Sequence, residues 1–145
     1  MTAADATRTV QVTRRFAASP ERVFDAWLDP DKARRFLFVA PTGTMVRAEI
    51  DVRVGGRFIF TDRRDGQDVD HVGQYLEIDR PRRLVFTFAV PAYSAESTAV
   101  TLDIAPEGSG CELTLTHAGV LPDYVDQTKA GWGMILENLG RVAES

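Results

Sequence analysis

Residues 19–27 read SPERVFDAW and decide the fold, because they turn an extended chain into a helix with one apolar side. The serine offers a side-chain oxygen to a free amide of the first turn, and the proline after it loses only an amide that has no partner there. Val23, Phe24 and Trp27 then share one side at helical spacing. This pattern predicts a short helix whose apolar side is pressed against a partner.

The segments on either side of this helix extend the prediction. Residues 9–16 place Val10 and Val12 on one face of a first strand. After the helix, an Asp-Pro-Asp stretch repeats the capping chemistry and predicts a second short helix over residues 31–36. Two short helices are therefore expected directly after the first strand.

The middle of the chain alternates apolar and polar residues in short runs separated by glycine turns, which is typical of antiparallel strands. Leu84, Phe86 and Phe88 share one strand face, and Leu113, Leu115 and His117 share another in the same way. Gly73 lies inside a strand pattern, which indicates a bulge or the close approach of another backbone. The predicted strands are residues 44–52, 57–61, 69–78, 84–90, 100–104 and 113–117.

From residue 122 onward the spacing is helical again, and Trp132, Leu136 and Leu139 fall on one side. An antiparallel sheet with an apolar face needs a cover, which a terminal helix supplies. We therefore predict an α+β fold in which a curved antiparallel sheet of about six or seven strands wraps around a long C-terminal helix. If the sheet does not close tightly on the helix, a cavity lies between them.

Composition limits the class of protein. A length of 145 residues suits one domain, so we expect residues 1–8 to be a flexible tail and residues 9–145 a single domain. The net charge of -4 gives no attraction for nucleic acid or an anionic membrane. The sole cysteine, Cys111, cannot form an intrachain disulfide, and neither a signal peptide nor a membrane span is present in the sequence. A soluble, cytoplasmic protein is expected.

Six segments in this order resemble one family. The chain is similar to the activator of Hsp90 ATPase homologue 1-like (AHSA1-like) family of the Bet v 1 / START-like (SRPBCC) superfamily, over about residues 9–143. The resemblance implies a helix-grip fold, and Phe36 stands where the family often has tryptophan. The segments are ASPERVFDAW (18–27), DVRVGGRF (51–58), GQYLEI (73–78), RRLVFTF (82–88), LTLTH (113–117) and GW (131–132).

A cavity in such a fold would have apolar and aromatic walls, and it would favour a small apolar or aromatic ligand. The same side chains also suit a filled core. The candidate ligand-binding residues are Trp27, Phe36, Phe38, Phe58, Phe60, Tyr75, Phe86, Phe88, Leu102, Leu115, His117, Trp132 and Leu136.

His117 is the polar candidate on this face. It is suited to orient a ligand or to move a proton near neutral pH, whereas the alternative is a structural histidine bonded to a backbone carbonyl. His71 is less clearly directed inward. The two histidines do not share a metal-ligand spacing, so we expect no metal and no cofactor.

Three functions remain open from the sequence. We favour a non-enzymatic module that binds or senses a small hydrophobic molecule. The second is an enzyme resembling the polyketide cyclases or dehydratases of the superfamily, with His117 and Tyr75 as the candidate pair and catalytic residues otherwise unknown. The third is a co-chaperone of Hsp90, which the family name suggests; the eukaryotic co-chaperones carry a separate N-terminal domain, for which residues 1–8 leave no space. A homodimer through edge strands is a further expectation.

Overall fold

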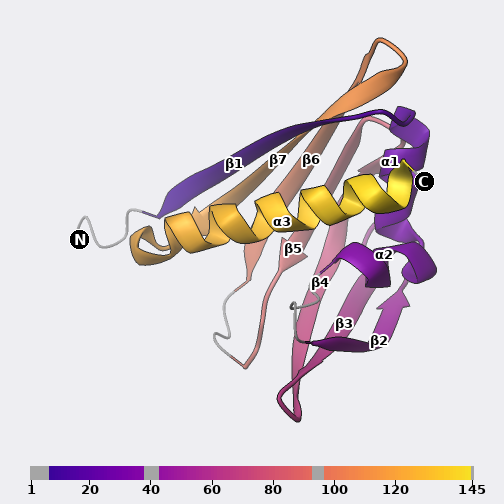
Figure 1. Cartoon of the computed structure of the whole chain (residues 1–145). Coiled ribbons are helices and arrows are strands. Elements are labelled where there is room, and N and C mark those ends of the chain that lie inside the picture. Colours follow the sequence, from indigo (N-terminus) through magenta and orange to yellow (C-terminus); the bar gives the residue numbers. More distant parts are fainter. Residues whose placement is uncertain (1–6, 38–42, 93–96, 145) are drawn as a thin grey trace.

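A seven-stranded antiparallel sheet curves around a long C-terminal helix in the computed structural model, which describes residues 7–37, 43–92 and 97–144 (Figure 1). The sheet order is β1-β7-β6-β5-β4-β3-β2. This arrangement confirms the predicted α+β class. The strands are β1 (Arg8–Phe16), β2 (Thr44–Ile50), β3 (Arg57–Arg64), β4 (Gln67–Asp79), β5 (Arg83–Phe88), β6 (Thr98–Glu107) and β7 (Gly110–Val120).

Two short helices, α1 (Pro20–Leu28) and α2 (Pro30–Phe36), follow β1 as expected. The Ser19 side chain accepts a hydrogen bond from the Arg22 amide at 3.2 Å, and Asp29 caps the next helix through the Asp31 amide at 2.9 Å. Because proline needs no amide partner at the first position, each helix begins at its proline.

The long helix α3 (Val125–Ala143) follows a 3-10 turn at Pro122–Tyr124 and crosses the inner face of the sheet (Figure 1). Its buried residues include Trp132, Leu136 and Leu139, as the helical spacing predicted. At its far end Glu144 accepts a hydrogen bond from the Ala17 amide at 2.7 Å. The C-terminal end of α3 is thereby joined to the link between β1 and α1.

Strand alternation builds the inner face in rows. Leu84 of β5 lies opposite Leu102 of β6, which lies opposite Leu115 of β7, and all three are buried. Burying leucine side chains stabilises the fold by roughly 2 kcal/mol each. The period of two in the sequence was therefore a correct guide to the core.

The strand that pairs with β4 changes along the length of β4. The first part of β4 pairs with β3, and from Tyr75 onward β4 pairs with β5, with a register shift before Glu77. Gly73 lies at this junction, where an added Cβ atom would be 1.9 Å from the Thr87 carbonyl oxygen and 2.4 Å from the Phe58 ring. The close backbone approach predicted at Gly73 is therefore present.

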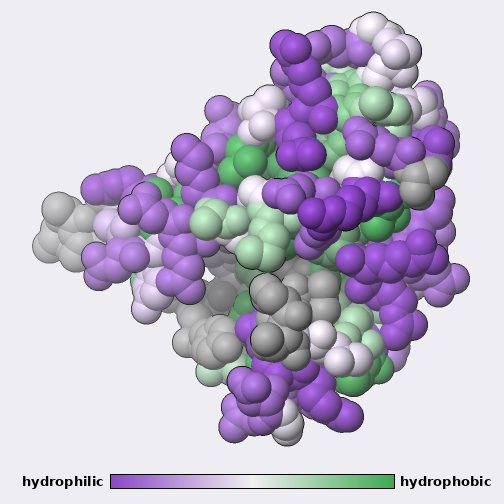
Figure 2. All heavy atoms as spheres, viewed as in Figure 1, coloured by the Kyte–Doolittle hydropathy of each residue, from purple (hydrophilic) through white to green (hydrophobic). Residues whose placement is uncertain are grey.

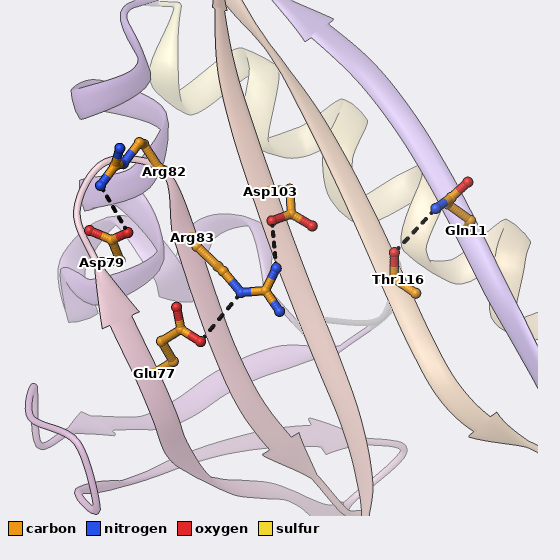
Figure 3. Close-up of polar contacts among 7 residues, drawn as sticks. All are labelled: Gln11, Glu77, Asp79, Arg82, Arg83, Asp103 and Thr116. Atoms are coloured by element: carbon orange, nitrogen blue, oxygen red, sulfur yellow. Dashed lines mark hydrogen bonds and ion pairs between the residues drawn. The ribbon is translucent and has the colours of Figure 1, made fainter.

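The outer face of the sheet is polar. Figure 3 shows Arg83 of β5 between Glu77 of β4 and Asp103 of β6, on the side away from α3, with N–O distances of 3.4 and 3.0 Å. Gln11 and Thr116 make a similar cross-strand contact at 3.3 Å. The opposite side of the molecule is also largely hydrophilic around α3 (Figure 2). Among the described helices, none has the length and apolar character to span a bilayer.

Candidate functional site

A small void lies inside the fold, between the sheet and the segment formed by α1 and the end of α2. Its volume is about 10 Å³. Five of its seven wall residues are among those predicted from the sequence, and Leu37 and Leu84 are the additions. The walls are Trp27, Leu37, Phe58, Phe60, Tyr75, Leu84 and Phe86.

Aromatic rings pack closely around this void. The Phe58 ring centre lies 5.5 Å from that of Phe86, 5.6 Å from that of Tyr75 and 5.8 Å from that of Phe60. Trp27 meets Phe36 edge to face at 5.1 Å. Such ring pairs add about 1 kcal/mol each beyond the burial of area, so packing between the rings holds the walls in place.

Two polar groups belong to these walls. The indole Nε1 of Trp27 is buried and has no hydrogen-bond partner. The Tyr75 hydroxyl makes no hydrogen bond to another described residue, although the Tyr75 backbone pairs with Gly55 and Gly56. Burial raises the pKa of Tyr75 far above its usual value, so the hydroxyl stays protonated at neutral pH. Both groups are therefore hydrogen-bond donors in an apolar setting.

His117 lies in a second cluster, where both ring nitrogens have partners. Trp132 Nε1 donates to His117 Nδ1 at 2.9 Å, and because indole nitrogen is only a donor, Nδ1 must be the acceptor. Nε2 then donates to the Thr98 hydroxyl at 2.6 Å, which in turn donates to the Phe88 carbonyl at 3.3 Å. Burial lowers the pKa of His117 to about 4. The histidine is therefore neutral. Its hydrogen-bond partners are the side chains of Thr98 and Trp132, and not the backbone carbonyl that a structural histidine was expected to have.

His71 extends this cluster to β3 and β4, and it is more deeply buried than the sequence indicated, at 5% exposed. Its ring stacks on Phe88 with centres 6.1 Å apart. Nδ1 donates to the Phe60 carbonyl at 3.3 Å, and Arg64 donates to Nε2 at 3.4 Å. Burial, followed by the nearby Arg64 charge, lowers the pKa of His71.

Asp62 is a buried residue that the sequence reasoning missed. Its carboxylate is 0% exposed and forms an ion pair with Arg64. The signal was present, because Phe58, Phe60, Asp62 and Arg64 continue one alternating row along β3. Reading the row past its apolar members would have placed this ion pair on the inner face.

The remaining predicted residues are distributed through the core. Phe36, Leu102, Leu115 and Leu136 are fully buried, and Phe88 joins the His117 cluster. Phe38 lies outside the described residues. The prediction thus named two separate groups, one around the void and one around His117. The candidate pair of His117 and Tyr75 is divided between them.

A groove of about 630 Å³ lies on the outer face, over the junction at Gly73, and was not predicted. Phe58 contributes to both the groove and the inner void. The other residues that line the groove are a mixture of charged, polar and apolar ones. They are Glu49, Ile50, Asp51, Arg57, Ile59, Val72, Gly73, Gln74, Thr87, Ala89 and Ser97.

No group of three or more histidine, cysteine, aspartate or glutamate side chains within residues 7–37, 43–92 and 97–144 is placed to hold a metal ion. What this part of the molecule offers is a close-packed aromatic interior with a few buried donors. Such an interior can enclose an uncharged molecule, because burying a charge without a partner is costly.

The fold and the apolar interior define a helix-grip α+β protein of the Bet v 1-like class. The chain belongs to the family described as activator of Hsp90 ATPase homolog 1-like proteins, whose sequence profile matches residues 17–144. The family predicted from the six sequence segments is thus confirmed.

Solved structures agree with this assignment. Protein CV1439 from Chromobacterium violaceum is 27% identical, with a TM-score of 0.86 over 94% of this chain and 97% of that one. CalU16 from Micromonospora echinospora is 26% identical, with a TM-score of 0.72 over 94% of this chain and 76% of that one. An AHSA1-like protein from Aeromonas hydrophila is 24% identical, with a TM-score of 0.79 over 94% and 92%, and this likeness shows the fold alone. Among curated proteins, none matches the chain.

Proposed function

We propose that this chain binds a small apolar or aromatic molecule between the sheet and the α1–α2 segment, at the void walled by Trp27, Phe58 and Tyr75. The observation that supports the proposal is a void inside a helix-grip fold whose walls are mostly aromatic and carry no charged side chain. Pockets with such a lining select ligands by their shape and by how much of their apolar surface is buried away from water on binding.

Binding in this place requires movement. A space of about 10 Å³ is near the minimum for a single water molecule. Ligand sites for drug-sized molecules usually measure roughly 300–1,000 Å³. A ligand therefore enters by rotating the aromatic walls or by moving the α1–α2 segment and α3 away from the sheet, and its affinity is reduced by the free energy of that opening.

The first test is native mass spectrometry of the purified protein, followed by denaturation and identification of any molecule released. We expect an apolar compound of defined mass. Thermal shift assays with a panel of aromatic and lipid compounds supply the second readout, because a ligand that binds only the folded state raises Tm. An empty protein that no compound stabilises contradicts the proposal.

A matched pair of variants locates the site. Leu84→Phe adds volume to the void wall and should remove the thermal shift, whereas Leu84→Met conserves volume and should retain it. Equal shifts in both variants would place the ligand elsewhere. The outer groove, with its charged Glu49 and Arg57, is then the next position to probe.

The enzymatic alternative receives less support from the side chains. A cyclase-like reaction steered by His117 and Tyr75 needs the two groups at one substrate, and they lie in separate clusters, with both His117 nitrogens engaged. His117→Ala discriminates the roles. Lost turnover with retained affinity would favour catalysis, whereas lower stability with retained binding would favour the structural role.

The co-chaperone alternative is tested directly by adding the protein to Hsp90 and measuring ATP hydrolysis. We expect no stimulation. Stimulation that depends on the chain would instead make a protein partner the function to pursue.

A further inference from the structure

Trp27 and Tyr75 both line the void, and each side chain carries a hydrogen-bond donor. The Trp27 side chain is 2% exposed and its Nε1 lacks an acceptor. Tyr75 is 3% exposed, and its hydroxyl has no hydrogen bond to another described residue. Since a buried donor without an acceptor lowers stability, the unpaired Trp27 indole at this small space points to a partner that enters it, and the Tyr75 hydroxyl is a second donor on the same walls.

The other walls define the charge of that partner. Leu37, Phe58, Phe60, Leu84 and Phe86 complete the described lining, and none carries a charge. An anion placed there would lose its hydration without gaining a cation, and an ammonium group would meet two donors. A neutral oxygen acceptor fits, because a carbonyl oxygen has two lone pairs and can accept from both donors.

We propose that the void is a subsite for the neutral carbonyl oxygen of a mainly apolar ligand, held by hydrogen bonds from Trp27 Nε1 and the Tyr75 hydroxyl. This inference rests on the proposed binding function and specifies the ligand class. The ligand is an aromatic or aliphatic ketone, aldehyde or ester. A plain hydrocarbon of the same shape would leave the Trp27 donor unpaired.

Three probes of nearly equal shape separate these chemistries. Acetophenone carries the carbonyl, α-methylstyrene replaces its oxygen with a methylene group, and benzoate replaces the ketone with a carboxylate. We expect acetophenone to bind about tenfold more tightly than α-methylstyrene, as one or two neutral hydrogen bonds imply, and benzoate to bind more weakly than either. Titration calorimetry gives the three Kd values.

Nuclear magnetic resonance supplies a readout that does not depend on a variant folding. The indole Nε1–H signal of Trp27 should move downfield when acetophenone is added and should move less with α-methylstyrene. The Trp132 indole signal is the internal control, because its N–H already donates to His117. An unmoved Trp27 signal during saturation by acetophenone overturns the subsite.

Variants assign the donors. Tyr75→Phe removes only the hydroxyl, and Trp27→Phe removes the indole donor; each should reduce the preference for acetophenone over α-methylstyrene several-fold. Trp132→Phe is the control and should leave the preference unchanged. If Trp27→Phe fails to fold, Tyr75→Phe and the wild-type signals still decide the question.

The outcomes separate this inference from the proposed function. Equal affinities for the ketone and the hydrocarbon, or a co-purified ligand without an oxygen acceptor, overturn the carbonyl subsite and leave apolar binding in place. Absence of binding by every probe, together with an empty purified protein, overturns both.

Discussion

His117 shows how strongly one side chain is fixed by its neighbours. Trp132 can only donate, so the histidine must accept at Nδ1 and donate from Nε2 to Thr98. A second proton on the ring would place two donors face to face. The fold therefore holds this histidine in one neutral tautomer.

Thr98→Val tests that arrangement, because valine keeps the branched shape and removes the hydroxyl. The variant leaves Nε2–H of His117 without its acceptor, so the free energy of unfolding should fall by about 1–3 kcal/mol. Urea unfolding at pH 7.5 measures the change. Thr101→Val on the outer face is the control, for which we expect less than about 0.5 kcal/mol. Equal effects would show that the hydroxyl of Thr98 is not needed.

Stability should also depend on pH through the two buried histidines. Folded His117 has a pKa of about 4, whereas an unfolded histidine titrates near 6.5. Between these values the unfolded chain binds more protons, so stability is complete above pH 6.5 and decreases toward pH 4. The slope should be about 1.4 kcal/mol per pH unit for each proton. The pKa of His71 is also lowered in the folded protein, so this residue too makes stability decrease as the pH falls.

Urea unfolding at half-unit steps from pH 4.5 to 7.5 measures this slope. His117→Asn, which cannot titrate, should flatten it relative to the wild type. A wild-type profile that does not change across this window would contradict the lowered pKa.

Among the elements, β4 has a geometry that depends on a glycine, Gly73. Gly73→Ala would bring a Cβ atom against the Thr87 carbonyl and the Phe58 ring, so we expect a loss of at least about 3 kcal/mol or failure to fold. Gly131→Ala is the matched control, because nothing lies within 4 Å of the added atom in α3. The control should gain about 0.5–1 kcal/mol from helix propensity. Circular dichroism melting curves compare the two, and a tolerated Gly73→Ala would contradict the close approach.

The contact between α1 and the turn after β4 makes a smaller contribution. Arg80 binds both oxygens of Asp25, at 2.7 and 2.8 Å, and its hydrogen bond lowers the pKa of that carboxyl. Both side chains are about half exposed, so Asp25→Asn should cost less than about 1 kcal/mol. The cost should disappear in 1 M salt, where screening acts over about 3 Å. Unfolding with and without salt measures it, and a cost that survives the salt would indicate more than an exposed ion pair.

The elements could be predicted because their signals are local. Capping at Ser19 and Asp29 depends on residues a few positions apart, and the rows of β5, β6 and β7 follow from a period of two. The register shift near Tyr75 was not predicted, since it depends on partners in other strands. The inward position of Asp62 was missed although the alternating row of β3 indicated it.

At the scale of the whole molecule, the site was harder to predict than the fold. Alternation placed Phe58, Phe86 and His117 on the correct face, yet it did not divide them into the void and the histidine cluster. Cavity volume is the small difference between an enclosed space and the side chains that fill it. Sequence periodicity carries no information on that difference, so Trp27 Nε1 could not be identified as unpaired before packing was known.

The position of α3 after all seven strands has a consequence for synthesis of the protein. A ribosome delivers every strand before the helix that covers the inner face, so a nascent sheet presents Leu102 and Leu115 to water while α3 is still being made. During that interval the partially folded chain exposes apolar surface and is prone to aggregation. Slower translation of the α3 codons should therefore increase its dependence on chaperones. The same helix that completes the interior thus sets how long the newborn chain is vulnerable to aggregation.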